Sequence, residues 1–177
     1  MRVGGFLDVV GSRRMAVTVL AAITGLYYLI VAITNCTDTD TNRRGVDAVL
    51  SMRRTIHHGS TDWHAITNST VILIVYILIV AWEFLIALVL LSATVAWIRT
   101  LLGRPAQALA MKLATLGWTM VVLLFLGGFL TIAGEWFRMW ANKEVNASSA
   151  ALQNFLVAAV GLILVHLPDR DLPPPPN

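Results

Sequence analysis

Long apolar segments alternate with shorter polar ones along most of the chain. The longest apolar segment covers residues 70–98 and contains a single acidic or basic residue, Glu83. At about 1.5 Å per residue, a helix of this length exceeds the ~30 Å hydrocarbon layer of a bilayer. Further apolar segments of spanning length occur at about residues 15–34, 113–134 and 150–167. The pattern predicts an all-α, polytopic membrane protein with a four-helix transmembrane bundle.

The polar segments divide the rest of the chain. We expect one membrane domain over residues 1–167 and an extended, disordered proline-rich tail over residues 168–177. The first 14 residues fit either a short helix on the membrane surface or a frayed tail.

The longest polar segment, residues 35–68, separates the first two spans. It opens with turn-forming residues, and then Val46, Val49 and Leu50 recur at helical spacing. This spacing predicts a short amphipathic helix within a structured outer loop between helices 1 and 2. Ordered loops of this length often carry function.

Composition narrows the class of protein. The 177 residues are 57% hydrophobic and 13% charged, whereas soluble domains have about 25% charged residues. No basic tract with interleaved aromatic residues indicates nucleic-acid binding. The single cysteine, Cys36, excludes an intrachain disulfide. We therefore expect the lipid bilayer to be the main environment.

The basic residues predict an orientation. They lie near both termini and in the connection between the second and third spans: Arg2, Arg13, Arg14, Arg99, Arg104, Lys112 and Arg170. By the positive-inside rule, both termini are cytoplasmic and the first loop faces outward. The first loop also contains four arginines, but four aspartates accompany them, and long loops are weaker determinants of topology.

Glu83 is the first candidate for function. On a helix it shares a face with Tyr76, Val80, Ala87 and Leu90. Ionisable residues at membrane mid-depth often carry protons, coordinate cations or bind ligands such as a quinone or a lipid headgroup. The alternative is a neutral glutamic acid bonded to a neighbouring span, for example to a Thr or Tyr of the first span. No second charged residue within a span pairs with Glu83, which weakens the case for proton transport.

The segment after the third span is the second candidate. It contains Glu135, Trp136, Arg138 and Trp140. Tryptophans beside charged residues are typical of an anchor at the membrane interface, here with a local Glu–Arg pair. Alternatively, the segment packs on the first loop, where Trp63 and His64 lie, and forms an outward-facing lid or docking surface.

Metal binding and catalysis have little support. His57, His58 and His64 are weak metal candidates, because their spacing matches no established ligand pattern. No nucleophile motif, phosphate loop or dinucleotide motif is present. We expect no cofactor and no enzymatic activity.

Three stretches together resemble a known family. They are residues 34–38 (TNCTD), residues 49–52 with 63–67 (VLSM and WHAIT), and residues 134–140 (GEWFRMW). These stretches are similar to a bacterial family of small integral membrane proteins, domain-of-unknown-function family 2165. Glu83 matches a glutamate in the second span of such proteins. The resemblance implies a multi-pass protein of the bacterial plasma membrane.

Two functions remain open. The first is a non-enzymatic accessory or scaffold subunit of a larger membrane complex, such as a respiratory or lipid-handling one, with protein partners or further copies of itself. The second is a binder or transporter of a small lipophilic molecule (a quinone or a lipid) or of a cation, using Glu83 and the neighbouring Tyr76.

Overall fold

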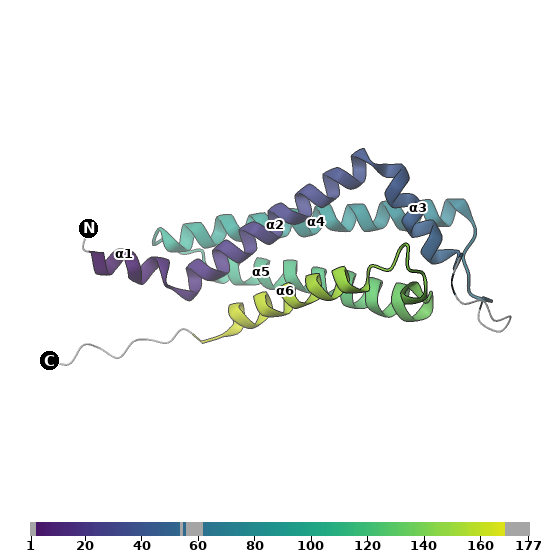
Figure 1. Cartoon of the computed structure of the whole chain (residues 1–177). Coiled ribbons are helices and arrows are strands. Elements are labelled where there is room, and N and C mark those ends of the chain that lie inside the picture. Colours follow the sequence, from purple (N-terminus) through teal and green to yellow (C-terminus); the bar gives the residue numbers. More distant parts are fainter. Residues whose placement is uncertain (1–2, 54, 56–61, 169–177) are drawn as a thin grey trace.

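The protein is an elongated bundle of helices. The computed structural model describes residues 3–53, 55 and 62–168. Within these residues, four helices are long and apolar enough to cross a membrane: α2 (Arg13–Thr37), α4 (Ser69–Leu101), the continuous helix Gln107–Trp136, and α6 (Ser148–His166). They lie side by side along the molecule (Figure 1). The predicted all-α, polytopic bundle is confirmed.

The third spanning helix begins earlier than the sequence pattern indicated. It starts at Gln107, not near residue 113, because residues 107–112 are mostly good helix formers placed after Pro105. It comprises α5 (Gln107–Val122) and η1 (Leu123–Trp136), a wider π-helix. In η1 the Thr131 hydroxyl donates to the Leu126 carbonyl, five residues earlier, at 2.8 Å. Long π-helices are rare in proteins, and apolarity alone gives no signal for one.

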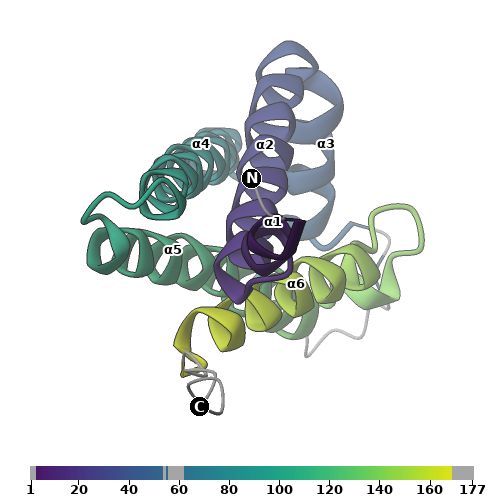
Figure 2. The ribbon, with the colours of Figure 1, turned by 90° about the vertical axis from the view of Figure 1, so that its left-hand side faces the viewer.

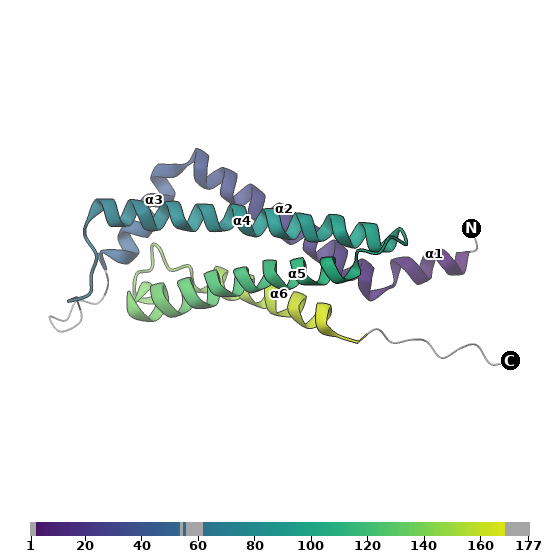
Figure 3. The ribbon, with the colours of Figure 1, turned by 180° about the vertical axis from the view of Figure 1, so that it is seen from behind.

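The bundle has two distinct ends (Figures 1 and 3). We call one the terminal end: it comprises α1 (Val3–Val10), the connection 102–106 and the last turn of α6. The other is the loop end: it comprises α3 (Thr39–Leu50), residues 62–68 and residues 137–147, which include the short helix η2 (Met139–Ala141). Viewed from the terminal end, α4 lies beside α2 and α5, and α6 lies beside α5 (Figure 2).

Small residues allow the spans to approach closely. A Cβ atom on Gly161 of α6 would lie 2.4 Å from the Trp118 ring of α5, closer than any real contact. Gly117, the residue directly before Trp118, faces the side chain of Leu90 on α4. Without a hydrophobic force between helices in lipid, such close packing is a main source of stability.

The described part of the first loop is structured, but its helix begins earlier than expected. α3 starts at Thr39, directly after α2, where turn-forming residues had indicated an irregular chain. Asp38 caps this helix by accepting a hydrogen bond from the Thr41 amide. The apolar face of α3 then packs into a second core at the loop end, formed by Val49, Leu50, Met52, Ile72, Phe137 and Met139.

Candidate functional site

Glu83 is buried between α4 and the end of α2. Only 4% of its surface is exposed, and the Asn35 side-chain amide donates a hydrogen bond to its Oε2 at 2.6 Å. The Tyr76 hydroxyl donates to the Asn35 backbone carbonyl. The partner is therefore Asn35, not a Thr or Tyr. Sequence patterning had assigned Asn35 to the loop, but α2 continues to Thr37.

The face predicted for Glu83 is confirmed. Tyr76, Val80, Ala87 and Leu90 are all buried with it. Because Tyr76 and Glu83 both contact Asn35, these three residues form one polar cluster that ties α2 to α4.

Glu83 does not lie at the middle depth of the membrane, where the sequence analysis placed it. Asn35 lies only three residues before Asp38, and Asp38 and Asp40 are both exposed at the start of α3. Charged, exposed side chains favour water or the headgroup layer over hydrocarbon. Glu83 therefore lies near a polar boundary of the bundle, although it occupies the middle of its own helix.

Several other polar side chains of the spans are also bonded within the protein, although the buried Trp97 and Trp118 indoles have no hydrogen-bond partner among the described residues. The Tyr28 hydroxyl donates to Asn154 Oδ1 at 2.7 Å, which links α2 to α6. The Trp82 indole donates to the Met120 carbonyl at 3.0 Å, which links α4 to α5. These hydrogen bonds join neighbouring helices, as expected for polar groups in an apolar environment.

A cluster of aromatic rings lies at the loop end. We call it the aromatic surface: Trp63, His64 and Trp136, with the His64 ring packed on the buried Phe137. The Trp63 and Trp136 rings pack edge to face, 5.7 Å apart, and His64 Nε2 is 2.6 Å from the Trp136 carbonyl oxygen. The segment after the third span thus packs on the first loop, as the second interpretation predicted. Phe137 was missed because its burial depends on α3, which is distant in sequence.

The remaining residues of this segment differ from the anchor interpretation in one respect, the local ion pair. Arg138 has a left-handed backbone (φ 53°), which ends the helix and turns the chain. Within the described part of the chain, no ion pair joins Glu135 to Arg138, so the expected local pair is not formed. Glu135 is exposed, and Trp140 is 48% exposed in η2.

Metal ligands do not converge in the part of the chain that the structure describes. No group of three or more His, Cys, Asp or Glu side chains is close enough there to hold an ion. His64 contacts aromatic rings and a carbonyl instead. His57 and His58 lie outside the described residues.

The fold and its polar contacts define a small, four-span integral membrane protein. A family model described as predicted small integral membrane protein (DUF2165) matches residues 13–168, and the chain belongs to this family. The match runs from the start of α2 to the end of α6, so it includes Glu83 and the aromatic surface. Searches of curated proteins and of solved structures found no match.

Proposed function

We propose that this protein is a non-enzymatic accessory or scaffold subunit of a larger membrane complex, and that it binds its partner through the aromatic surface. One observation carries this proposal. Trp63 is 75% exposed and Trp136 is 51% exposed, yet each ring is held by the other and by His64.

Exposed tryptophans with a fixed orientation suit protein binding. A ring that is already ordered loses little conformational entropy when a partner covers it. Tryptophan is also among the residues most often found at the energetic centre of interfaces. The second core beneath the aromatic surface, with Phe137 and Met139 buried, keeps the surface rigid.

The charge distribution supports an orientation for this surface. Arg13, Arg14, Arg99, Arg104 and Lys112 all lie toward the terminal end. The positive-inside rule then favours a cytoplasmic terminal end in a bacterial plasma membrane. The partner would meet the aromatic surface on the outer side of that membrane.

A pull-down in mild detergent tests the proposal. The tagged wild-type protein should recover one or more other membrane proteins in constant proportion. The double variant Trp63→Ala, Trp136→Ala should lose them, because it removes both exposed rings. Leu102→Ala is the matched control, since Leu102 is 69% exposed at the terminal end.

The outcomes separate the alternatives. Recovery of only this chain by the wild type contradicts the accessory role, leaving self-association. Full recovery of partners by the double variant shows that the tryptophans serve as membrane-interface anchors. Glu83→Gln should leave recovery unchanged, because Glu83 is buried and bonds to α2, so it offers almost no surface to a partner.

A second candidate function has one specific observation in its favour. An apolar groove of about 580 Å³ between α2 and α4 is lined by Leu29, Phe84, Ala87 and Leu88. Ala81 and Phe84, which also line the groove, lie on either side of Glu83 in α4, so the groove would hold the apolar tail of a quinone or lipid near the polar cluster. Saturable binding of a quinone that is lost in Glu83→Gln would favour this function over the accessory role.

A further inference from the structure

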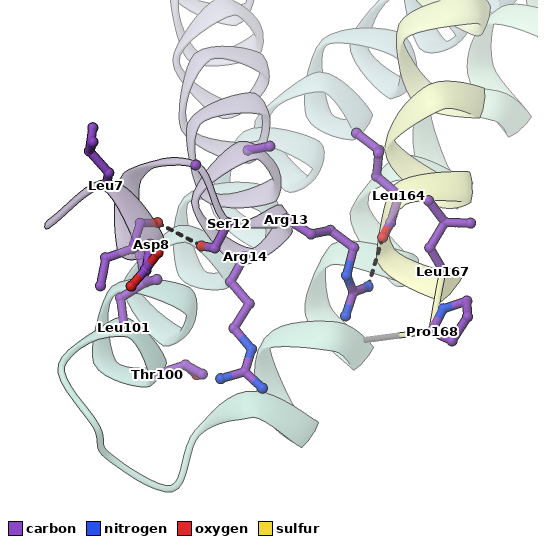
Figure 4. Close-up of a pocket in the computed structure, with 13 residues that line it drawn as sticks. Leu7, Asp8, Ser12, Arg13, Arg14, Thr100, Leu101, Leu164, Leu167 and Pro168 are labelled. Atoms are coloured by element: carbon purple, nitrogen blue, oxygen red, sulfur yellow. Dashed lines mark hydrogen bonds between the residues drawn. The ribbon is translucent and has the colours of Figure 1, made fainter. Parts of the chain in front are cut away.

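The short helix α1 lies outside the bundle, directly before the first spanning helix. It extends past the ends of α4 and α6 (Figures 1 and 3). A cavity of about 1030 Å³ opens beside it, with Leu7 and Asp8 of α1 on one side and Leu164 and Leu167 of α6 on the other (Figure 4). The cavity at the terminal end therefore separates α1 from the end of α6.

The two sides of α1 differ in polarity. Successive residues of a helix are about 100° apart, so Asp8 lies nearly opposite Phe6 and Val10, which share a face one turn apart. Asp8 lines the cavity, whereas Phe6 and Val10 do not. Phe6 is 58% exposed and Val10 is 46% exposed. The apolar face of α1 thus points away from the described part of the bundle.

A helix of this kind needs a partner for its apolar face. α1 has 8 residues, and isolated helices shorter than about 12–15 residues are only marginally stable in water. Two of its residues, Gly4 and Gly5, are also poor helix formers. Most helices in proteins owe their stability to the packing of an amphipathic face. The formation of α1 therefore requires that Phe6 and Val10 be covered.

The position of α1 identifies the partner as the lipid bilayer. Only Gly11 and Ser12 separate α1 from α2, a spanning helix. The start of α2 is tied to the end of α6, because Arg13 Nη1 donates to the Leu164 and Val165 carbonyls at 2.9 and 3.1 Å. Two spanning helices thus end at the same level, which corresponds to the boundary between hydrocarbon and headgroups. At that boundary a bilayer covers the apolar face of an amphipathic helix.

We propose that α1 binds the surface of the bilayer at the terminal end, with Phe6 and Val10 among the acyl chains and Asp8 toward water. At about 1.5 Å per residue, α1 is about 12 Å long, so it stays within the interfacial layer only when it lies along the membrane surface. A change of direction at Gly11 and Ser12 brings it there. This contact is independent of the aromatic surface, which lies at the loop end of the bundle.

Spin-label spectroscopy of the full chain in vesicles of phosphatidylethanolamine and phosphatidylglycerol tests the proposal. Each variant carries Cys36→Ser and one new cysteine for the label: Phe6→Cys, Asp8→Cys or Val10→Cys. Collisions of the label with oxygen report lipid, and collisions with a nickel chelate report water. The ratio of oxygen to nickel collisions should be severalfold higher at residues 6 and 10 than at residue 8. Val19→Cys provides the lipid reference, because Val19 is exposed within the α2 span.

A second variant tests whether the apolar face causes the contact. Phe6→Asp, with the label at residue 10, should lower the ratio there to the value found at residue 8, because a carboxylate disfavours the acyl region. Asp8→Asn is the matched control. It changes a polar side chain on the opposite face of α1, so it should leave the ratio at residue 10 unchanged.

Three results would overturn the proposal. Equal ratios with frequent nickel collisions at residues 6, 8 and 10 would place all of α1 in water. Few collisions with either reagent at residues 6 and 10 would show that protein covers the apolar face; if deletion of residues 169–177 removes that cover, the occupant is the C-terminal segment of this chain. An unchanged ratio at residue 10 in Phe6→Asp would show that the apolar face does not hold α1 at the bilayer.

Discussion

The Asn35 amide donates a hydrogen bond to the Glu83 carboxyl group at 2.6 Å, and this contact joins the last turns of α2 to the middle of α4. The two residues are 48 positions apart in the chain. Their contact means that the one acidic residue within the long apolar span has a partner in the neighbouring helix.

The pair should contribute measurably to stability. We expect Glu83→Ala and Asn35→Ala each to lower the free energy of unfolding by about 1–2 kcal/mol, the usual range for such hydrogen bonds. Glu83→Gln should cost less, because its amide oxygen still accepts from Asn35. Chemical denaturation in detergent, followed by circular dichroism, measures these differences. If the double alanine variant loses the sum of the two single losses, the residues do not interact.

Close packing of α5 on α6 should make Gly161 intolerant of a side chain. Gly161→Ala places a methyl group 2.4 Å from the Trp118 ring, so we expect a loss of about 1–3 kcal/mol from overpacking. Gly127→Ala is the control, because no atom beyond its own helical backbone and its two chain neighbours lies within 4 Å of the added Cβ. Thermal unfolding in detergent compares the two variants. Equal transition temperatures would show that the helices separate at little cost.

His64 should hold the aromatic surface in place. His64→Phe keeps a ring beside Trp136 but removes the 2.6 Å contact with the Trp136 carbonyl oxygen. We expect amides at the loop end to exchange about fivefold faster, which corresponds to one lost hydrogen bond. Hydrogen exchange with mass spectrometry measures this rate. His166→Phe, which instead removes a contact with Thr115 at the other end, should leave loop-end exchange unchanged.

The single cysteine provides a direct test of orientation. Cys36 is exposed near the start of α3, so a membrane-impermeant thiol reagent should label it from outside intact spheroplasts. Cys36→Ser combined with Leu102→Cys moves the thiol to the terminal end, where it should react only after lysis. The reverse pattern would place the aromatic surface on the cytoplasmic side.

Local pattern and elementary physics were sufficient for the class of fold. A bilayer accepts only segments whose backbone groups are bonded internally, so four apolar runs of spanning length had to be helices. The buried face of α4 was equally predictable, because Tyr76, Val80 and Ala87 follow helical periodicity from Glu83. The amphipathic spacing around Val49 likewise predicted a helix in the first loop.

Element boundaries were less predictable. The polar residues after residue 34 resemble a turn, but Asp38 caps a new helix there and lets α3 follow α2 almost without a break. The glycines of the third span gave no indication that its second half, η1, is a π-helix. In both cases hydrogen bonds decide the local structure. The pattern of apolar and polar residues does not reveal these bonds.

By itself, the sequence determined a four-span helical membrane protein, because segment length and apolarity govern insertion into a bilayer. Only the tertiary structure decided which groups meet. It placed Asn35 on Glu83, His64 on Trp136, and Arg13 and Arg14 around the cavity at the terminal end. These contacts depend on how helices distant in the chain cross and on the level along the bundle at which each helix ends. Periodicity along a single helix carries no information about the crossing or about that level.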